Sequence, residues 1–142
     1  MPSFELSVPD LHSSGPVIPL HIGPSRELIT VFGVNGIAAP ISVNALVDTG
    51  ASSTVITPEI VAHLNLKSVG LLPIFGLTTL EPVECRQFHI NMYFTEDFAV
   101  ENVLAIEAPL TGQPFQCLIG RDILSRGVLT YIGIENKFKL TF

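Results

Sequence analysis

The sequence predicts a mainly β protein, a closed or partly closed and mainly antiparallel barrel with one or two short helices and two hairpins. Short apolar or alternating runs, bounded by Gly, Pro and Asn, recur along the chain, as is typical of strands. They follow one another too closely for helical crossovers, which favours antiparallel pairing. Of the 142 residues, 47% are hydrophobic and 14% charged, a composition that excludes disorder.

Three strands are predicted in the first half of the chain: Val17–Ile22, Leu28–Phe32 and Ile41–Val47. The Asn-Gly pair at 35–36 predicts a turn between the last two, because both residues tolerate positive φ. The uncharged stretch 28–47 is long enough to cross a membrane. Its glycines, prolines and asparagines fit two strands and a turn instead, so no membrane span is predicted.

The second half contains two predicted hairpins. Leu71–Phe75 and Val83–Phe94 flank Gly76, which is placed at the tip of the first. Val128–Ile134 and Lys137–Phe142 form the second around a short turn. Apolar and polar residues alternate along the last strand, which indicates one buried face and one exposed face.

Two segments are predicted to be short helices. Thr57–Leu64 has a capping residue followed by Pro58 at the first helical position. Arg121–Arg126 is the second, ended by Gly127. Each follows an apolar strand ending in glycine, which makes a weak internal repeat. The first copy alone has an aspartate before its glycine.

Charge and composition exclude several classes of function. The net charge is −6, and the seven basic residues are not clustered, so nucleic-acid binding is not expected. Cys85 and Cys117 lie far apart and are interpreted as buried free thiols and not as a disulfide. The four histidines are scattered, and neither a metal nor another cofactor is expected. The N-terminal segment lacks the basic and apolar regions of a signal peptide, which favours a cytoplasmic location.

The segment Ala45–Ile56, ALVDTGASSTVI, carries the clearest chemical signal. Asp48 ends a fully apolar strand, Thr49 can place a hydroxyl under the loop, and Gly50 lets a backbone N–H approach the carboxylate. A carboxylate held in this way is suited to activating water for attack on a carbonyl. The alternative is a plain Asp-Thr-Gly turn between two strands. The apolar residues before it and the small residues after it favour the first interpretation.

This segment resembles the active-site segment of retropepsin-like aspartic proteases. CLIGRDIL at Cys117–Leu124 resembles the second signature of that family, and the two lie about 70 residues apart. The resemblance covers roughly residues 31 to 142. It implies that Asp48 is the catalytic aspartate.

The resemblance also gives roles to other residues. It places Thr49 in the grip between subunits, Gly50 beside the carboxylate and the substrate, and Ala51 at the small position typical of the retroviral branch. It gives Gly120 and Arg121 structural roles, and it places the substrate-binding flap at Ile74, Phe75, Gly76 and Leu77.

Three departures from the family pattern stand out. Ser52 replaces an aspartate that pairs with the arginine in many viral members, so Arg121 needs another acceptor, either Asp122 or a backbone carbonyl. The flap has one glycine, Gly76, where viral flaps have several. Residues 1–16 have no counterpart and could form an N-terminal extension of a single domain spanning 1–142.

A homodimer is expected because the chain has one Asp-Thr-Gly motif. Two close carboxylates share one proton, so that one acts as an acid and the other as a base. The second carboxylate should be Asp48 of another subunit on a twofold axis. Asp122 is the rival within the chain, but its position on a predicted helix favours an ion pair or a cap. In retroviral relatives the chain termini interleave, so Lys137–Phe142 could be a shared edge strand or could close its own hairpin.

The predicted function is therefore an aspartic endopeptidase that cuts extended peptides at apolar sites. The main alternative is a retropepsin-fold module, weakly active or inactive, that serves dimerisation or binding. A third candidate is an unrelated small β-barrel that holds an apolar ligand.

Overall fold

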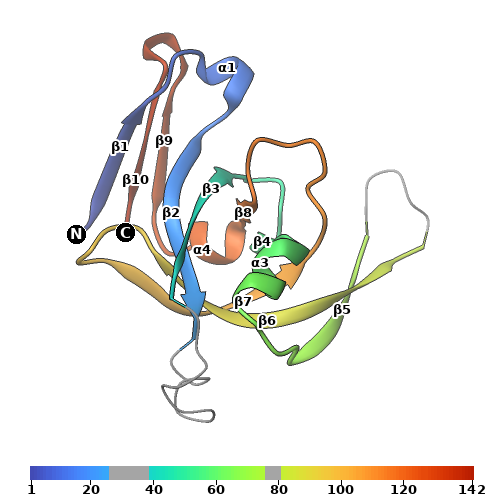
Figure 1. The fold of residues 1–142 in the computed structure, drawn as a ribbon. Helices are drawn as coiled ribbons and strands as arrows, with labels where there is room; N and C mark the ends of the chain where they lie inside the picture. The colour runs from blue at the N-terminus through green and yellow to red at the C-terminus, as the bar shows by residue number, and fades with distance from the viewer. Residues whose placement is uncertain (26–38, 76–80) are drawn as a thin grey trace.

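A ring of six strands forms the main body of the computed structural model, which describes residues 1–25, 39–75 and 81–142. The strands of the ring are β2 (Val17–Pro24), β3 (Ile41–Val47), β4 (Val55–Ile56), β6 (Val83–Tyr93), β7 (Ala99–Glu107) and β8 (Cys117–Ile119). Their order is β2-β3-β8-β4-β7-β6, and β6 pairs back to β2. The barrel is therefore closed, as the sequence predicts (Figure 1).

Most strand pairs of the barrel are antiparallel, but β3 pairs with β8, and β4 with β7, in parallel. The strand β5 (Gly70–Ile74) extends beyond the ring as the antiparallel partner of β6, which confirms the predicted hairpin. The strand β7 was not predicted, because Glu101 interrupts its apolar pattern. The predicted strand Leu28–Phe32 and the turn at 35–36 lie outside the described residues.

The helices are short; α3 and α4 lie close to the two predicted positions, whereas α1 was not predicted. They are α1 (Leu11–Ser14), α3 (Pro58–His63) and α4 (Arg121–Leu124). Thr57 is the N-cap of α3, yet its hydroxyl makes no capping hydrogen bond and is buried without a described partner. Among the residues that the structure covers, no helix has the length and apolar character to cross a membrane.

A second sheet of three strands stands beside the barrel (Figure 1). Its order is β1 (Ser3–Ser7), β10 (Lys137–Thr141) and β9 (Val128–Ile132), and both pairings are antiparallel. Of the two alternatives for the last strand, closure of its own hairpin is the one observed, because β10 pairs with β9. It also pairs with β1, so β10 is the central strand and not an edge strand. This central position was not predicted, because β1 lies in residues 1–16, to which no strand was assigned.

Fully buried side chains connect this sheet to the barrel. Phe138 and Leu140 of β10 belong to the same apolar core as Ile22, Phe88 and Met92 of the barrel strands. One face of β10 is thus buried, as the alternation along it predicts. The two sheets share one core, so any displacement of β10 should disturb the packing of the barrel.

Four phenylalanine rings pack against one another beside the three-stranded sheet: Phe4, Phe94, Phe98 and Phe142. Their ring centroids lie 5.4 to 6.4 Å apart, which is the range of favourable aromatic pairs. The cluster joins β1 and the residue after β10 to the turn between β6 and β7.

We expect Phe4→Ala to lower the free energy of unfolding by about 2–4 kcal/mol, because it removes a ring that contacts three others. Urea unfolding followed by circular dichroism measures the change. Phe75→Ala is the matched control, since that ring is 70% exposed and its loss should cost less than about 0.5 kcal/mol. Equal costs for the two variants would contradict a stabilising role of the cluster.

Candidate active site

The loop that contains Asp48 runs between two strands that are not paired with each other. It joins β3 to β4, and β8 lies between them, parallel to β3 and antiparallel to β4. The loop must therefore cross the end of β8. This crossing places Asp48, the first residue after β3, beside the C-terminal end of β8, where Gly120 begins the turn into α4.

Backbone contacts fix the position of Asp48. Its N–H donates to the carbonyl of Ile119 at 2.9 Å, and its own carbonyl accepts from Ala51 N–H at 3.2 Å. The side chain is half-buried. The N–H of Gly50 donates to Asp48 Oδ1 at 2.9 Å, so the approach of this glycine to the carboxylate is as the sequence suggests. A Cβ at position 50 would lie 3.1 Å from the same oxygen.

Arg121 supports the loop through backbone carbonyls. Its Nη1 donates to the carbonyl of Thr49 at 2.8 Å, and its backbone N–H donates to the carbonyl of Ala51 at 2.9 Å. Of the two acceptors that the sequence left open, the carbonyl is the one used. The guanidinium thus holds Thr49, the residue after Asp48, although Ser52 offers no carboxylate for it to pair with.

The carboxylate of Asp122, the rival to a second Asp48, is hydrogen-bonded to Thr54. Its carboxylate accepts from the N–H and the hydroxyl of Thr54, at 3.0 and 2.9 Å, and from Ile123 N–H at 2.9 Å. Thr54 is fully buried, and its hydroxyl also accepts from Gly120 N–H at 3.3 Å. Sequence reasoning did not assign a role to Thr54, because its partner lies 68 residues away and packing alone brings them together.

The predicted flap residues lie in part outside the described residues. Ile74 ends β5, Phe75 follows it and is 70% exposed, and Gly76 and Leu77 are not described. The base of the β5–β6 hairpin covers a small apolar cluster. Its members are Val55, Cys85 and Ile106, with Leu72, Ile74, Ala108, Leu110 and Leu118 packed against them.

An ion pair reinforces the same hairpin. Arg86 of β6 donates from Nε and Nη2 to the two carboxylate oxygens of Glu107, each at 2.8 Å, and its guanidinium lies 5.3 Å from the ring centre of Phe88. The hairpin is thereby tied to β7. A hollow of about 550 Å³ lies on this side, lined in part by Pro58, Ile74 and Glu107.

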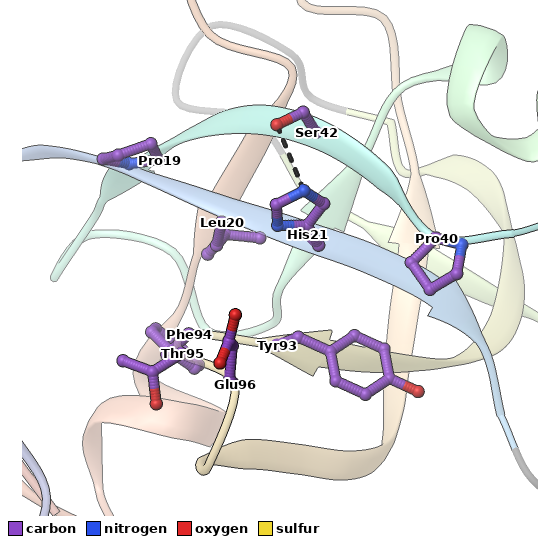
Figure 2. Close-up of a pocket in the computed structure, with 9 residues that line it drawn as sticks. All are labelled: Pro19, Leu20, His21, Pro40, Ser42, Tyr93, Phe94, Thr95 and Glu96. Atoms are coloured by element: carbon purple, nitrogen blue, oxygen red, sulfur yellow. Dashed lines mark hydrogen bonds between the residues drawn. The ribbon is translucent and has the colours of Figure 1, made fainter.

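A groove of about 640 Å³ lies elsewhere on the barrel (Figure 2). His21 and Ser42 face each other in it, with 3.4 Å between Nε2 and Oγ, and Tyr93 and Glu96 form its other side. None of its lining residues belongs to the Asp48 loop. This groove is therefore separate from the carboxylate that the sequence singles out.

The thiols offer no alternative nucleophile. Cys85 and Cys117 are free and buried, as predicted. Burial, and then the charge of Asp122, raises the pKa of the Cys117 thiol far above its ordinary value, so this group stays protonated. Within residues 1–25, 39–75 and 81–142, no group of three or more His, Cys, Asp or Glu side chains is placed to hold a metal.

Comparisons with known proteins agree with this geometry. A family model described as aspartyl protease matches residues 31–123. No curated protein sequence gives a significant match. Among solved structures, a retropepsin-like aspartic protease from Rickettsia conorii matches with a TM-score of 0.55 and 13% sequence identity, over 98% of this chain and 91% of that chain.

A second match is the EIAV protease in complex with an inhibitor, with a TM-score of 0.40 and 20% identity, over 66% of this chain and 90% of that chain. The family match covers well over half of the sequence and includes both the Asp48 loop and the start of α4. The chain belongs to the aspartyl protease family and has a retropepsin-like fold.

Proposed function

We propose that the protein is an aspartic endopeptidase that hydrolyses extended peptides with two Asp48 carboxylates, one from each subunit of a homodimer. The observation that carries the proposal is the placement of Asp48. Its carboxylate is half-buried at a strand end, accepts a hydrogen bond from Gly50 N–H at 2.9 Å, and lies on a loop that Arg121 holds.

The chemistry needs two carboxylates and one shared proton. The ionised Asp48 takes a proton from water while the water oxygen attacks the carbonyl carbon of the substrate. The protonated Asp48 of the partner subunit donates its proton to the carbonyl oxygen. Proton transfer to the amide nitrogen then allows the C–N bond to break. Thr49 would grip the partner loop, and Gly50 and Ala51 would leave room for the substrate backbone.

The other aspartates of the chain support the need for a partner. Asp122 is bound to Thr54. Asp10 caps α1, and hydrogen bonds from Ser13 lower the pKa of its carboxyl. Asp97 is exposed in the turn between β6 and β7. None of these carboxylates lies in the Asp48 loop, which supports a second subunit as the source of the second carboxylate.

The apolar residues at the base of the β5–β6 hairpin suggest a preference for apolar substrates. Ile74, Phe75, Gly76 and Leu77 would close over a peptide bound beside Asp48. The apolar cluster under β5 and β6 includes Val55 of β4, the strand that follows the Asp48 loop, and Leu118 of β8, the strand that lies between β3 and β4. Substrates with apolar side chains on either side of the cut bond would suit these apolar walls.

One argument for the alternative, an inactive dimerisation or binding module, was that Ser52 leaves Arg121 without its usual aspartate partner. This argument is weakened, because Arg121 holds the Asp48 loop by donating to the carbonyl of Thr49.

The test is cleavage of peptide libraries by the purified protein. We expect cuts between apolar residues, inhibition by a statine-type transition-state mimic, and no loss of activity with chelators or thiol reagents. Because the pair must carry one proton, the rate should fall at both acidic and alkaline pH. A stable dimer that binds peptides without cutting any would instead support the binding module, and activity that rises steadily into alkaline pH would indicate another nucleophile.

A further inference from the structure

The groove in Figure 2, called the His21 groove below, lies where the barrel opens between β2 and the turn after β6. The strand β2 pairs with β3 from Val17 onward, but it pairs with β6 over His21–Pro24 alone. The strand β6 ends at Tyr93. Residues 17–20 of β2 thus have a strand on one side, and the groove of about 640 Å³ lies on the other.

The open side of β2 is not suited to pairing with a further strand. Pro19 is in register with Asn44 of β3. The N–H of Asn44 donates to Gln116 Oε1 at 3.0 Å, and its carbonyl accepts from Gln116 N–H at 2.9 Å. Because Asn44 directs both groups away from β2, the backbone carbonyl of Pro19 faces the groove. Proline has no N–H to offer a new strand, so the groove is suited to receiving side chains.

Two rings form an apolar wall of the groove. Tyr93 and Pro40 pack over Gly23, where a Cβ would lie 3.1 Å from the ring of Pro40 and 3.3 Å from that of Tyr93. The Tyr93 hydroxyl accepts from Asn91 Nδ2 at 3.3 Å, and Asn91 is almost fully buried. The aromatic ring is therefore held in place before a ligand arrives, which lowers the entropic cost of binding.

Glu96 supplies the charge of the groove, and the turn that carries it is well fixed. The N–H groups of Phe94 and Thr95 donate to the carbonyl of Phe98 at 3.0 and 3.2 Å. Thr95 Oγ1 accepts from the N–H groups of Asp97 and Phe98 at 3.3 and 3.1 Å. The rings of Phe94 and Phe98 belong to the four-ring cluster beside the three-stranded sheet. The backbone at Glu96 is therefore preorganised.

The charge of the groove is negative and unbalanced. Its lining contains one carboxylate, that of Glu96, and neither lysine nor arginine. In the part of the chain that the structure describes, the ion pairs use three other glutamates, Glu5, Glu107 and Glu135. The whole chain has a net charge of −6. A carboxylate beside an aromatic ring and proline rings favours a cation on an apolar stem, which describes the side chains of arginine and lysine.

We propose that the His21 groove is an accessory binding site for a basic side chain of the polypeptide substrate, arginine in preference to lysine. The guanidinium would pair with the Glu96 carboxylate and lie against the ring of Tyr93, and the methylene stem would contact Pro40. A planar guanidinium is suited to both contacts. The inference rests on the proposed endopeptidase, because the basic residue belongs to the chain that Asp48 cuts and lies well away from the cut bond.

The span from the groove to Asp48 sets the length of substrate that can reach both. Ser42 borders the groove near the start of β3, and Asp48 follows the end of the same strand. At the rise of a strand, the distance along β3 between these residues is about 20 Å. A Gly-Ser linker of about 12 residues has an r.m.s. length of about 17–21 Å, which matches this span. A linker of about two residues extends about 7 Å at most and cannot bridge it.

The first test compares peptides that share one apolar segment cut by the protein and differ in the tail. The first peptide carries the long Gly-Ser linker and Arg-Arg, the second carries the same linker and Gln-Gln, and a short-linker pair repeats the two tails. Each is made with its tail at the N-terminus and at the C-terminus. For at least one end, we expect kcat/KM to be about tenfold higher for the long Arg tail than for the long Gln tail. The gain should come from a lower KM, since the tail binds ground state and transition state alike. The short-linker pair should differ less than about twofold.

Glu96→Gln tests the carboxylate, and Asp97→Asn is its matched control. Asp97 is the next residue, is equally exposed, and does not line the groove. The advantage of the long Arg tail should fall below about twofold in Glu96→Gln and persist in Asp97→Asn. Salt at about 0.5 M should also reduce it, because exposed ion pairs are screened. An equal loss in both variants would indicate general attraction to an acidic chain and would overturn the site.

The second test measures binding without cleavage. N-acetylarginine methylamide is titrated into the ¹⁵N-labelled protein, with N-acetylglutamine methylamide as the control compound. We expect the arginine compound to shift the amide signals of Leu20, Tyr93 and Glu96 and to leave that of Gly50 in place. The glutamine compound should shift none of them, and Glu96→Gln should abolish the effect.

The outcomes separate this inference from the proposed activity. Shifts confined to the groove in a protein that cuts no peptide would support the basic-side-chain site and refute the endopeptidase. Equal kcat/KM for the long Arg and Gln tails, or shifts that avoid the groove, would overturn the accessory site even where apolar peptides are cut.

Discussion

Asp48→Asn is expected to reduce the rate of peptide hydrolysis by about 10²–10⁴-fold, the range that acid–base groups typically contribute. The amide can still accept the hydrogen bond from Gly50 N–H through its Oδ1, and its volume is nearly that of the acid. The fold and the dimer should therefore persist, and the loss should be in kcat at unchanged thermal stability. Single-turnover cleavage of a fluorogenic apolar peptide measures it.

The matched control is Asp97→Asn, which makes the same change at an exposed carboxylate in the turn between β6 and β7. Its activity should stay within about twofold of the wild type. Retention of more than about a hundredth of the activity in Asp48→Asn would mean that another group activates the water. Equal losses in both variants would point to a general effect of charge.

Gly120→Ala should have the largest effect on the architecture of the site. An added Cβ would lie 2.5 Å from the backbone carbon of Ser53 and 2.6 Å from its oxygen, and real contacts do not come so close. The Asp48 loop or the start of α4 must therefore move. We expect a loss of about 3 kcal/mol or more in the free energy of unfolding, at the upper end of overpacking effects, together with a fall in kcat/KM of more than tenfold.

Gly23→Ala provides a comparison in which the collision is with side chains. Its Cβ would lie 3.1 Å from the ring of Pro40 and 3.3 Å from that of Tyr93, both of which can shift. Gly23 follows Ile22, which pairs with Ile41 at the start of β3, at the opposite end of that strand from Asp48. We expect a loss of about 1 kcal/mol or less and normal turnover. If Gly120→Ala were as stable and active as Gly23→Ala, the contact with Ser53 would not be holding the loop.

The sequence predicted the local parts of this protein well. The bounds of β3, the pairing of β5 with β6 and the approach of Gly50 to Asp48 follow from short-range patterns: an apolar run, two strand-like runs close together in the sequence, and a motif of three residues. These features depend on neighbours within a few positions. Periodicity and turn chemistry read such features directly.

Longer-range features were not predictable from one sequence. The hydrogen bonds between Asp122 and Thr54, and the choice of the Thr49 carbonyl by Arg121, depend on β8 lying between β3 and β4. The central position of β10 depends on β1, whose short alternating pattern was indistinguishable from a terminal extension. In each case the deciding partner lies more than 60 positions away, and local patterns carry no information about it.

The pairing of β1 with β10 also governs when the fold can be completed during synthesis. Ser3 and Thr141 contact each other across 138 positions of chain, so closing this sheet carries a large loop-closure entropy and should be slow. A nascent chain that has emerged only as far as α4 already contains the whole Asp48 loop. It still lacks the strand that joins its first residues to β9. On the ribosome, the barrel can therefore form before β10 completes the three-stranded sheet.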